Sequence, residues 1–151
     1  MKRRTFLQGT LAASAAGLAV SAGLLTPRAV MAANPAFEAK TLADALSGIG
    51  AGSAAESGDV KIKAPEIAEN GAVVPVTVSS SAAGTTELSI LVEGNPTPLV
   101  ATFILGEGAQ PEASTRIKMG KTSNIIAIAK AGDKTLSAKQ EVKVTIGGCG
   151  G

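Results

Sequence analysis

Hydrophobic residues occupy every second position in a series of short runs that begins at Val60 and continues to Ile146. A period of two residues is typical of β-strands that bury one face. Turn-forming residues such as Asn70-Gly71 separate the runs. The runs cover residues 59–67, 74–78, 88–92, 98–105, 115–119, 124–129 and 136–146. About seven short strands at this spacing predict an all-β fold, an immunoglobulin-like β-sandwich.

Two prolines, Pro75 and Pro98, lie inside these strand-like runs. Because proline has no backbone N–H to donate to a ladder, both are expected at sheet edges, bulges or strand starts. The core is expected to consist of Val, Ile, Leu and Ala, with Phe37 and Phe103 as its only aromatic side chains.

The segment before the strands has a helical spacing instead. Asn34-Pro35 is a good helix start, with Asn as the N-cap and Pro at the first helical position. Apolar residues at spacings of three and four then predict a short helix within residues 33–50. Residues 51–58 are rich in Gly, Ala and Ser, so we expect a flexible linker before the β-sandwich domain at 59–146. The apolar face of the helix consists of Phe37, Leu42, Ala45, Leu46 and Ile49.

The N-terminus has the pattern of an export signal. Arg3 and Arg4 precede a long stretch of Ala, Gly and Leu, and the small residues that end it favour cleavage after Ala32 or Ala33. The twin arginine is typical of the bacterial Tat pathway, so residues 1–32 predict a periplasmic protein. A transmembrane helix is the alternative, but this stretch is weakly hydrophobic and Pro27-Arg28 interrupts it.

Removal of residues 1–32 changes the charge of the protein. The whole chain has 14 basic and 12 acidic side chains, and four of the basic ones lie in residues 1–32. The remaining chain then has ten basic and twelve acidic side chains, which gives a net charge of −2. No basic patch remains that would favour nucleic acid binding.

The chain has no His, which is the commonest general base and the commonest neutral metal ligand. It has a single Cys, so it cannot form a CxxC pair. We therefore expect no metal and no other cofactor.

The only cysteine, Cys149, lies at the C-terminus between two glycine pairs, Gly147-Gly148 and Gly150-Gly151. Glycine accepts almost any backbone conformation and offers no side chain that could bury the thiol. Five extended residues reach at most about 17 Å. We therefore expect residues 147–151 to form a thin, flexible arm that carries one accessible thiol.

The reactivity of this thiol is expected to depend on other proteins. A model-peptide cysteine has a pKa of about 8.5, so only a few per cent of such a thiol is ionised at pH 7. The terminal carboxylate on Gly151 disfavours the thiolate further, and the chain has no His to assist. A frayed tail whose cysteine only forms an intermolecular disulfide is the simpler alternative.

A Tat-type signal combined with a terminal Gly-Gly-Cys-Gly-Gly is a specific pairing of features. Because of this pairing, and of residues 65–71, 92–96, 115–117 and 142–151, the chain resembles the SoxY family. Members of this family are the sulfur-carrier subunits of the SoxYZ complex in bacterial thiosulfate oxidation. The resemblance covers essentially the whole chain.

The resemblance implies a substrate carrier rather than an enzyme. A c-type cytochrome would couple thiosulfate oxidatively to Cys149, a hydrolase would release sulfate and leave a persulfide, and a sulfane dehydrogenase would oxidise the outer sulfur. A SoxZ-like β-sandwich subunit would complete a heterodimer, and neither nucleic acid nor a membrane is an expected partner. The glycines would admit Cys149 to narrow active sites.

Proteins of other classes could share some of these features. The main alternative is a non-catalytic exported β-sandwich module that forms intermolecular disulfides through Cys149. A ubiquitin-like sulfur carrier needs ATP-dependent activation of its last glycine, which an exported protein lacks, and a β-grasp pattern that the runs do not show. A stand-alone thiol enzyme lacks a histidine base.

Overall fold

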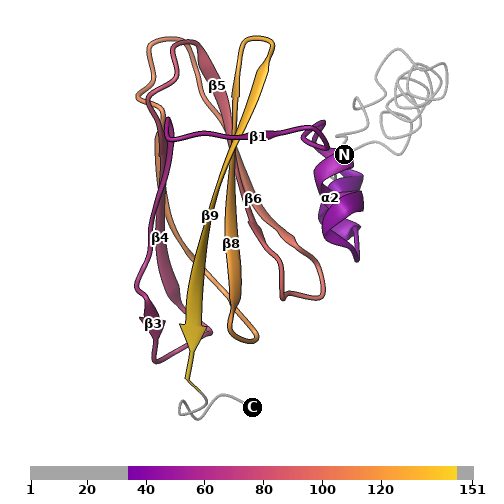
Figure 1. Ribbon diagram of the computed structural model, residues 1–151, viewed down its shortest axis with the longest axis vertical. Helices are drawn as coiled ribbons and strands as arrows, with labels where there is room; N and C mark the ends of the chain where they lie inside the picture. The colour runs from indigo at the N-terminus through magenta and orange to yellow at the C-terminus, as the bar shows by residue number, and fades with distance from the viewer. Residues whose placement is uncertain (1–33, 146–151) are drawn as a thin grey trace, which may run out of the picture. The chain divides into compact units, whose positions relative to one another are not determined.

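The computed structural model describes residues 34–145, which form two packed β-sheets and a short helical segment (Figure 1). The larger sheet consists of β1 (Ala55–Glu56), β3 (Ile67–Ala68), β5 (Thr85–Val92), β6 (Leu99–Ile104), β8 (Ser123–Ala131) and β9 (Lys134–Val144). The smaller sheet consists of β2 (Val60–Lys63), β4 (Val74–Ser80) and β7 (Glu112–Ile117).

The strand order places β9 inside the larger sheet. That sheet is hydrogen-bonded in the order β1-β9-β8-β5-β6, with β3 as a further partner of β9, and the smaller sheet has the order β2-β4-β7. The contacts of β5 with β6, of β5 with β8 and of β8 with β9 are all antiparallel. The predicted all-β sandwich is confirmed.

The alternating pattern does not mark β1 or β3 as a strand of its own, since the predicted run at 59–67 covers β2 and reaches only Ile67 of β3. β1 and β3 have two residues each, and both pair with β9 in parallel. Strands this short cannot display a period of two. β1 lies within residues 51–58, where Ala51 is 1% exposed and the Ser57 N–H donates to the Ser137 carbonyl at 3.0 Å. This segment is attached to the sheet, which differs from the expected flexible linker.

The core between the sheets is aliphatic. On β9 the predicted buried face is confirmed for its described members, because Leu136, Ala138, Val142 and Val144 all pack in this core. Gln140 lies in the same series, and its Nε2 donates to the Ala64 carbonyl at 3.1 Å. The buried strand residues include Val74, Val76 and Val78 of β4, Leu88, Ile90 and Val92 of β5, and Ile125, Ala127 and Ala129 of β8.

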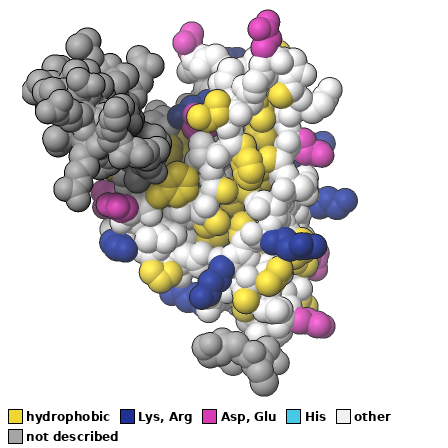
Figure 2. All heavy atoms as spheres, turned by 180° about the vertical axis from the view of Figure 1, so that it is seen from behind, with side chains coloured by type: hydrophobic (Ala, Val, Ile, Leu, Met, Phe, Trp, Pro, Cys, Tyr) yellow, Lys and Arg dark blue, Asp and Glu magenta, His cyan; other side chains and the backbone are white. Residues whose placement is uncertain are grey.

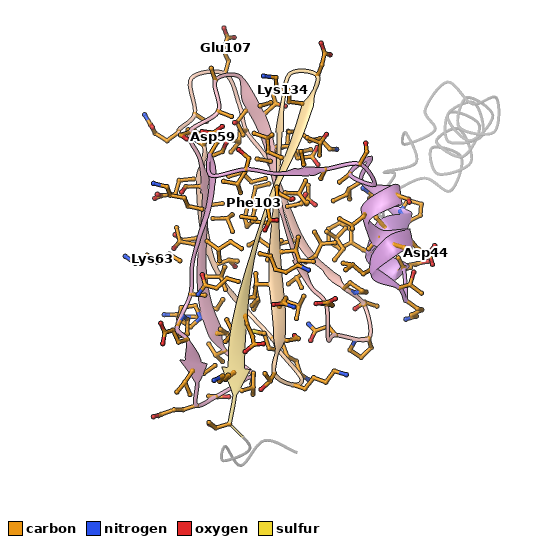
Figure 3. All side chains as sticks on the ribbon, viewed as in Figure 1. Asp44, Asp59, Lys63, Phe103, Glu107 and Lys134 are labelled. Carbon is orange, nitrogen blue, oxygen red and sulfur yellow. The ribbon has the colours of Figure 1, made fainter. Side chains whose placement is uncertain are left out.

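The aromatic part of the core prediction is wrong for Phe37, which is 38% exposed. Its neighbour Ala36 is the residue that faces inward. Phe103 is only partly buried and packs against the aliphatic core (Figure 3). Aliphatic side chains therefore provide nearly all of the buried surface between the sheets.

The N-terminal segment forms two short helices, η1 (Pro35–Glu38) and α2 (Leu42–Gly48), where the spacing predicts one. The Asn34 side chain accepts from the Ala36 N–H at 3.0 Å, which confirms the predicted N-cap. Thr41 caps α2 by accepting from the Asp44 N–H at 3.1 Å. This second cap explains the division, because an N-cap residue leaves the helical conformation.

The helices cover the outer face of the larger sheet. Ala45 of α2 is fully buried, in a second hydrophobic cluster with Leu91 of β5 and Ile126 of β8. The remaining buried members of the cluster are Ala36, Ile49, Ala51, Leu99 and Ile128.

Both prolines occupy the expected kinds of position. Pro75 lies in β4, whose pairing with β2 covers only residues 77–80. At Pro75 the strand therefore pairs with β7 on one side and has no partner strand on the β2 side. Pro98 immediately precedes β6, and its carbonyl accepts from the Val92 N–H at 2.8 Å.

The turn at Asn70-Gly71 approaches the end of β9 closely. The Gly71 carbonyl accepts from the Met119 N–H at 2.7 Å. A Cβ atom on Gly71 would lie 2.5 Å from the Met119 carbonyl oxygen and 2.8 Å from Val144 Cγ1. Glycine is needed here because there is no room for a side chain.

We predict that Ala45→Glu lowers the free energy of unfolding by about 2–4 kcal/mol, because it places a charge in the apolar helix–sheet interface. Urea denaturation measures this change. Ala43→Glu, on the exposed face of the same helix, is the control and is expected to have little effect. Equal losses in the two variants would show that α2 does not pack on the sheet as described.

We predict that Gly71→Ala lowers the free energy of unfolding by about 1–3 kcal/mol, because the added methyl group meets a backbone carbonyl. Gly58→Ala is the matched control, since a Cβ there meets nothing within 4 Å. It is expected to change the free energy by less than about 1 kcal/mol. A neutral Gly71→Ala substitution would contradict the close approach.

Candidate functional site

The residues of the predicted thiol arm lie outside the described residues, as do Arg3 and Arg4 of the predicted export signal. The structure describes the strand that leads to the arm, as far as Thr145. The arm residues concerned are Gly147, Gly148, Cys149, Gly150 and Gly151.

The end of β9 extends past its long neighbour. Val142 pairs with Ser123, the first residue of β8, and the ladder between these two strands stops there. An unpaired strand end exposes its backbone donors and frays easily. Residues 143–145 therefore need other hydrogen-bond partners.

On one side of the strand, β3 and the residue before it provide these partners. The Lys143 N–H donates to the Glu66 carbonyl at 2.9 Å, and the Thr145 N–H donates to the Ala68 carbonyl at 3.1 Å. The Thr145 hydroxyl reaches the Ala68 carbonyl as well, at 3.5 Å. This parallel pairing holds alternate residues of the strand end.

On the other side, a threonine side chain continues the ladder in place of β8. Thr122 Oγ1 accepts from the Val144 N–H at 2.9 Å and lies 3.4 Å from the Val144 carbonyl, to which it can donate. Successive residues of a strand point their N–H groups to opposite sides. All three backbone N–H groups of residues 143–145 are therefore satisfied, and the strand is anchored up to Thr145.

Two loops at this end of the sandwich are fixed by side-chain amides. Asn95 Nδ2 donates to the Lys118 carbonyl at 2.7 Å, and Asn95 Oδ1 accepts from the Gly120 N–H at 3.1 Å. Asn124 Nδ2 donates to Glu93 Oε2 at 2.7 Å. These bonds tie the loop at 93–96 to the loop that contains Thr122.

Two of the segments that the sequence singled out support the end of β9. Residues 65–71 supply β3 and the Gly71 turn beside the end of β9, at the lower end of the view in Figure 1. Residues 92–96 hold the loop that precedes Thr122. These segments therefore support the strand that leads to Cys149.

The described residues 34–145 include no group of three or more His, Cys, Asp or Glu side chains that could hold a metal ion. No helix in this part of the chain is long and apolar enough to span a membrane. The ionisable groups around the end of β9, such as Glu66, Lys121 and Lys143, are exposed.

Sequence reasoning missed Thr122 and the role of Gly71. Thr122 follows a Gly-Lys turn and has no periodic signal of its own, so only the position of its hydroxyl reveals its partner. Asn70-Gly71 is recognisable as a turn, but the close approach to Met119 and Val144 depends on tertiary structure.

Comparison with known proteins identifies the family. The family model described as sulfur oxidation protein SoxY matches residues 47–149. The chain is similar to the solved structure of the sulfur carrier protein SoxY from Chlorobium limicola f thiosulfatophilum, with 45% identity and a TM-score of 0.64 over 74% of this chain and 97% of that one. A search of curated proteins gives no match.

A second solved structure shares the fold alone. It is the superoxide reductase (neelaredoxin) from Ignicoccus hospitalis, with 22% identity and a TM-score of 0.52 over 60% of this chain and 83% of that one. The SoxY model, in contrast, spans both the sandwich and the residue predicted to carry sulfur. The chain therefore belongs to the SoxY family of sulfur oxidation proteins.

Proposed function

We propose that this sulfur carrier holds intermediates of thiosulfate oxidation covalently on Cys149 and presents them to partner enzymes. Membership of the SoxY family supplies the carrier role. The observation that supports the attachment point is the backbone anchored up to Thr145, four residues before Cys149 in the sequence, which is the only cysteine of the chain.

Loading is an oxidation. The Cys149 thiolate and the outer sulfur of thiosulfate form a sulfur–sulfur bond, and two electrons leave to a c-type cytochrome partner. The product is a cysteine S-thiosulfonate. The chain has no histidine to generate the thiolate, so the partner supplies the environment that ionises Cys149.

Release proceeds by hydrolysis. Water attacks the terminal sulfonate sulfur, sulfate leaves, and a persulfide stays on Cys149. A sulfane dehydrogenase oxidises the outer sulfur of the persulfide to the sulfonate level with three waters and the loss of six electrons. A second hydrolysis then frees sulfate and the original thiolate.

The cycle takes place outside the cytoplasm in this proposal. The twin arginine, Arg3-Arg4, supports export by the Tat pathway into the periplasm. A SoxZ-like β-sandwich subunit forms the heterodimer with the chain, and the glycines on either side of Cys149 admit the thiol to narrow active sites.

We predict that protein isolated without reductant from thiosulfate-grown cells carries adducts of sulfur atoms, thiosulfate or sulfonate on Cys149. Intact-protein mass spectrometry detects them, and Cys149→Ser is the control that should lack every adduct. An unmodified mass, or a disulfide dimer alone with and without thiosulfate, would contradict the carrier function. It would favour the exported module that forms intermolecular disulfides.

We predict that iodoacetamide alkylates Cys149 in the isolated chain slowly at pH 7. The rate should rise about tenfold per pH unit up to about pH 8, because the reactive thiolate fraction grows in this way below a pKa of about 8.5. Rates measured by mass spectrometry from pH 6 to 10 test this. A fast rate that is flat with pH would mean that the chain activates its own thiol.

A further inference from the structure

The short distance between Thr145 and Cys149 restricts where a partner enzyme can bind. Cys149 follows Thr145 by four residues, so its Cα lies at most about 14 Å from the anchored end of the strand. An enzyme that takes Cys149 into its active site must therefore lie against the end of the sandwich where β9 stops. This step rests on the proposed function.

Exposed hydrophobic side chains lie at this end. Ile67 is 57% exposed and pairs with Lys143 at the end of β9. Val73 is 49% exposed and follows the turn whose Gly71 touches Val144 and Met119. Isoleucine and valine side chains at this exposure lose contact with water when a partner covers them.

The backbone that carries both side chains is already ordered. Ile67 belongs to β3, and the carbonyls of its two chain neighbours, Glu66 and Ala68, accept from the Lys143 and Thr145 N–H groups. Before Val73, Asn70 Oδ1 accepts from the Ala72 N–H at 3.0 Å, and the Asn70 carbonyl accepts from the Val73 N–H at 3.3 Å. A preformed surface of this kind binds with little loss of conformational entropy.

The charges around the two side chains are mixed. Glu66, Glu69, Lys121 and Lys143 are all exposed. Figure 2 shows acidic, basic and hydrophobic side chains close together at the lower end of the molecule. Because neither sign dominates, the apolar contacts rather than a net charge would favour binding here.

We propose that Ile67 and Val73 form a docking surface for the enzyme that loads sulfur onto Cys149, and that they contact an apolar rim around the mouth of its active site. The apolar rim would hold the β-sandwich in place while Cys149 enters the active site of the enzyme, so the docking contact would favour loading of the thiol. This function is separate from the chemistry at Cys149.

Ile67→Asp tests the docking surface, with Ile104→Asp as the matched control. Ile104 is 83% exposed and pairs with Glu87 at the end of β6. Glu107, three residues later in the chain, is labelled at the upper end of the molecule in Figure 3, opposite to the end where β9 stops. Each full-length variant is mixed with thiosulfate and the periplasmic fraction of thiosulfate-grown cells. The rate of adduct formation, measured by intact mass against carrier concentration, gives KM and the maximal rate.

We expect Ile67→Asp to raise the KM for the carrier about tenfold, as loss of an interface anchor does, with the maximal rate unchanged. Val73→Asp should raise it in the same direction, and Ile104→Asp should match the wild type. The alkylation rate of Cys149 and the urea midpoint should be unchanged in all three, which separates docking from folding and thiol reactivity.

An unchanged KM in both Ile67→Asp and Val73→Asp would overturn the docking surface and leave the carrier function intact. An equal rise in Ile104→Asp would overturn it as well, since the effect would then come from added charge anywhere on the surface. Absence of adducts on the wild-type chain would instead refute the carrier function, and the docking surface with it.

Discussion

Hydrogen bonds on both edges of residues 143–145 are the constraint on which the proposed function of this chain depends. β8 stops at Ser123, and from that point the carbonyls of Glu66 and Ala68 on one side and the Thr122 hydroxyl on the other hold the strand. Without them the last residues of β9 would have unpaired donors and would fray. In the proposed function, Cys149 reaches a partner enzyme from the end of this strand, and these bonds fix the position of that end.

The rest of the sandwich supports the same strand. β1 pairs with β9 near its start, at Leu136 and Ser137, and β3 pairs with it near its end. Val142 is fully buried between these contacts. The aliphatic core and the two short parallel strands therefore hold β9 near both of its ends.

The alternation of residues was sufficient to predict the class of fold, because strands with one buried face have a period of two that Val74, Val76 and Val78 display clearly. It could not predict β1 and β3, which are too short to show a period and exist because β9 offers them free edges. The burial of Phe37 was predicted wrongly, since a 3₁₀ turn rotates Ala36 inward instead. Thr122 was missed for a similar reason: one hydroxyl opposite a strand end leaves no pattern in the sequence.

The place of β9 in the sheet order has a consequence for the synthesis of the protein. It is the last of the described strands to leave the ribosome, yet it lies between β8 and β1 rather than at the margin of the sheet. Until it emerges, β8 has an open edge and the core lacks Val142, so the nascent chain stays incompletely folded until β9 has been made. A molecule that has folded is therefore one whose synthesis has reached the residues immediately before its thiol.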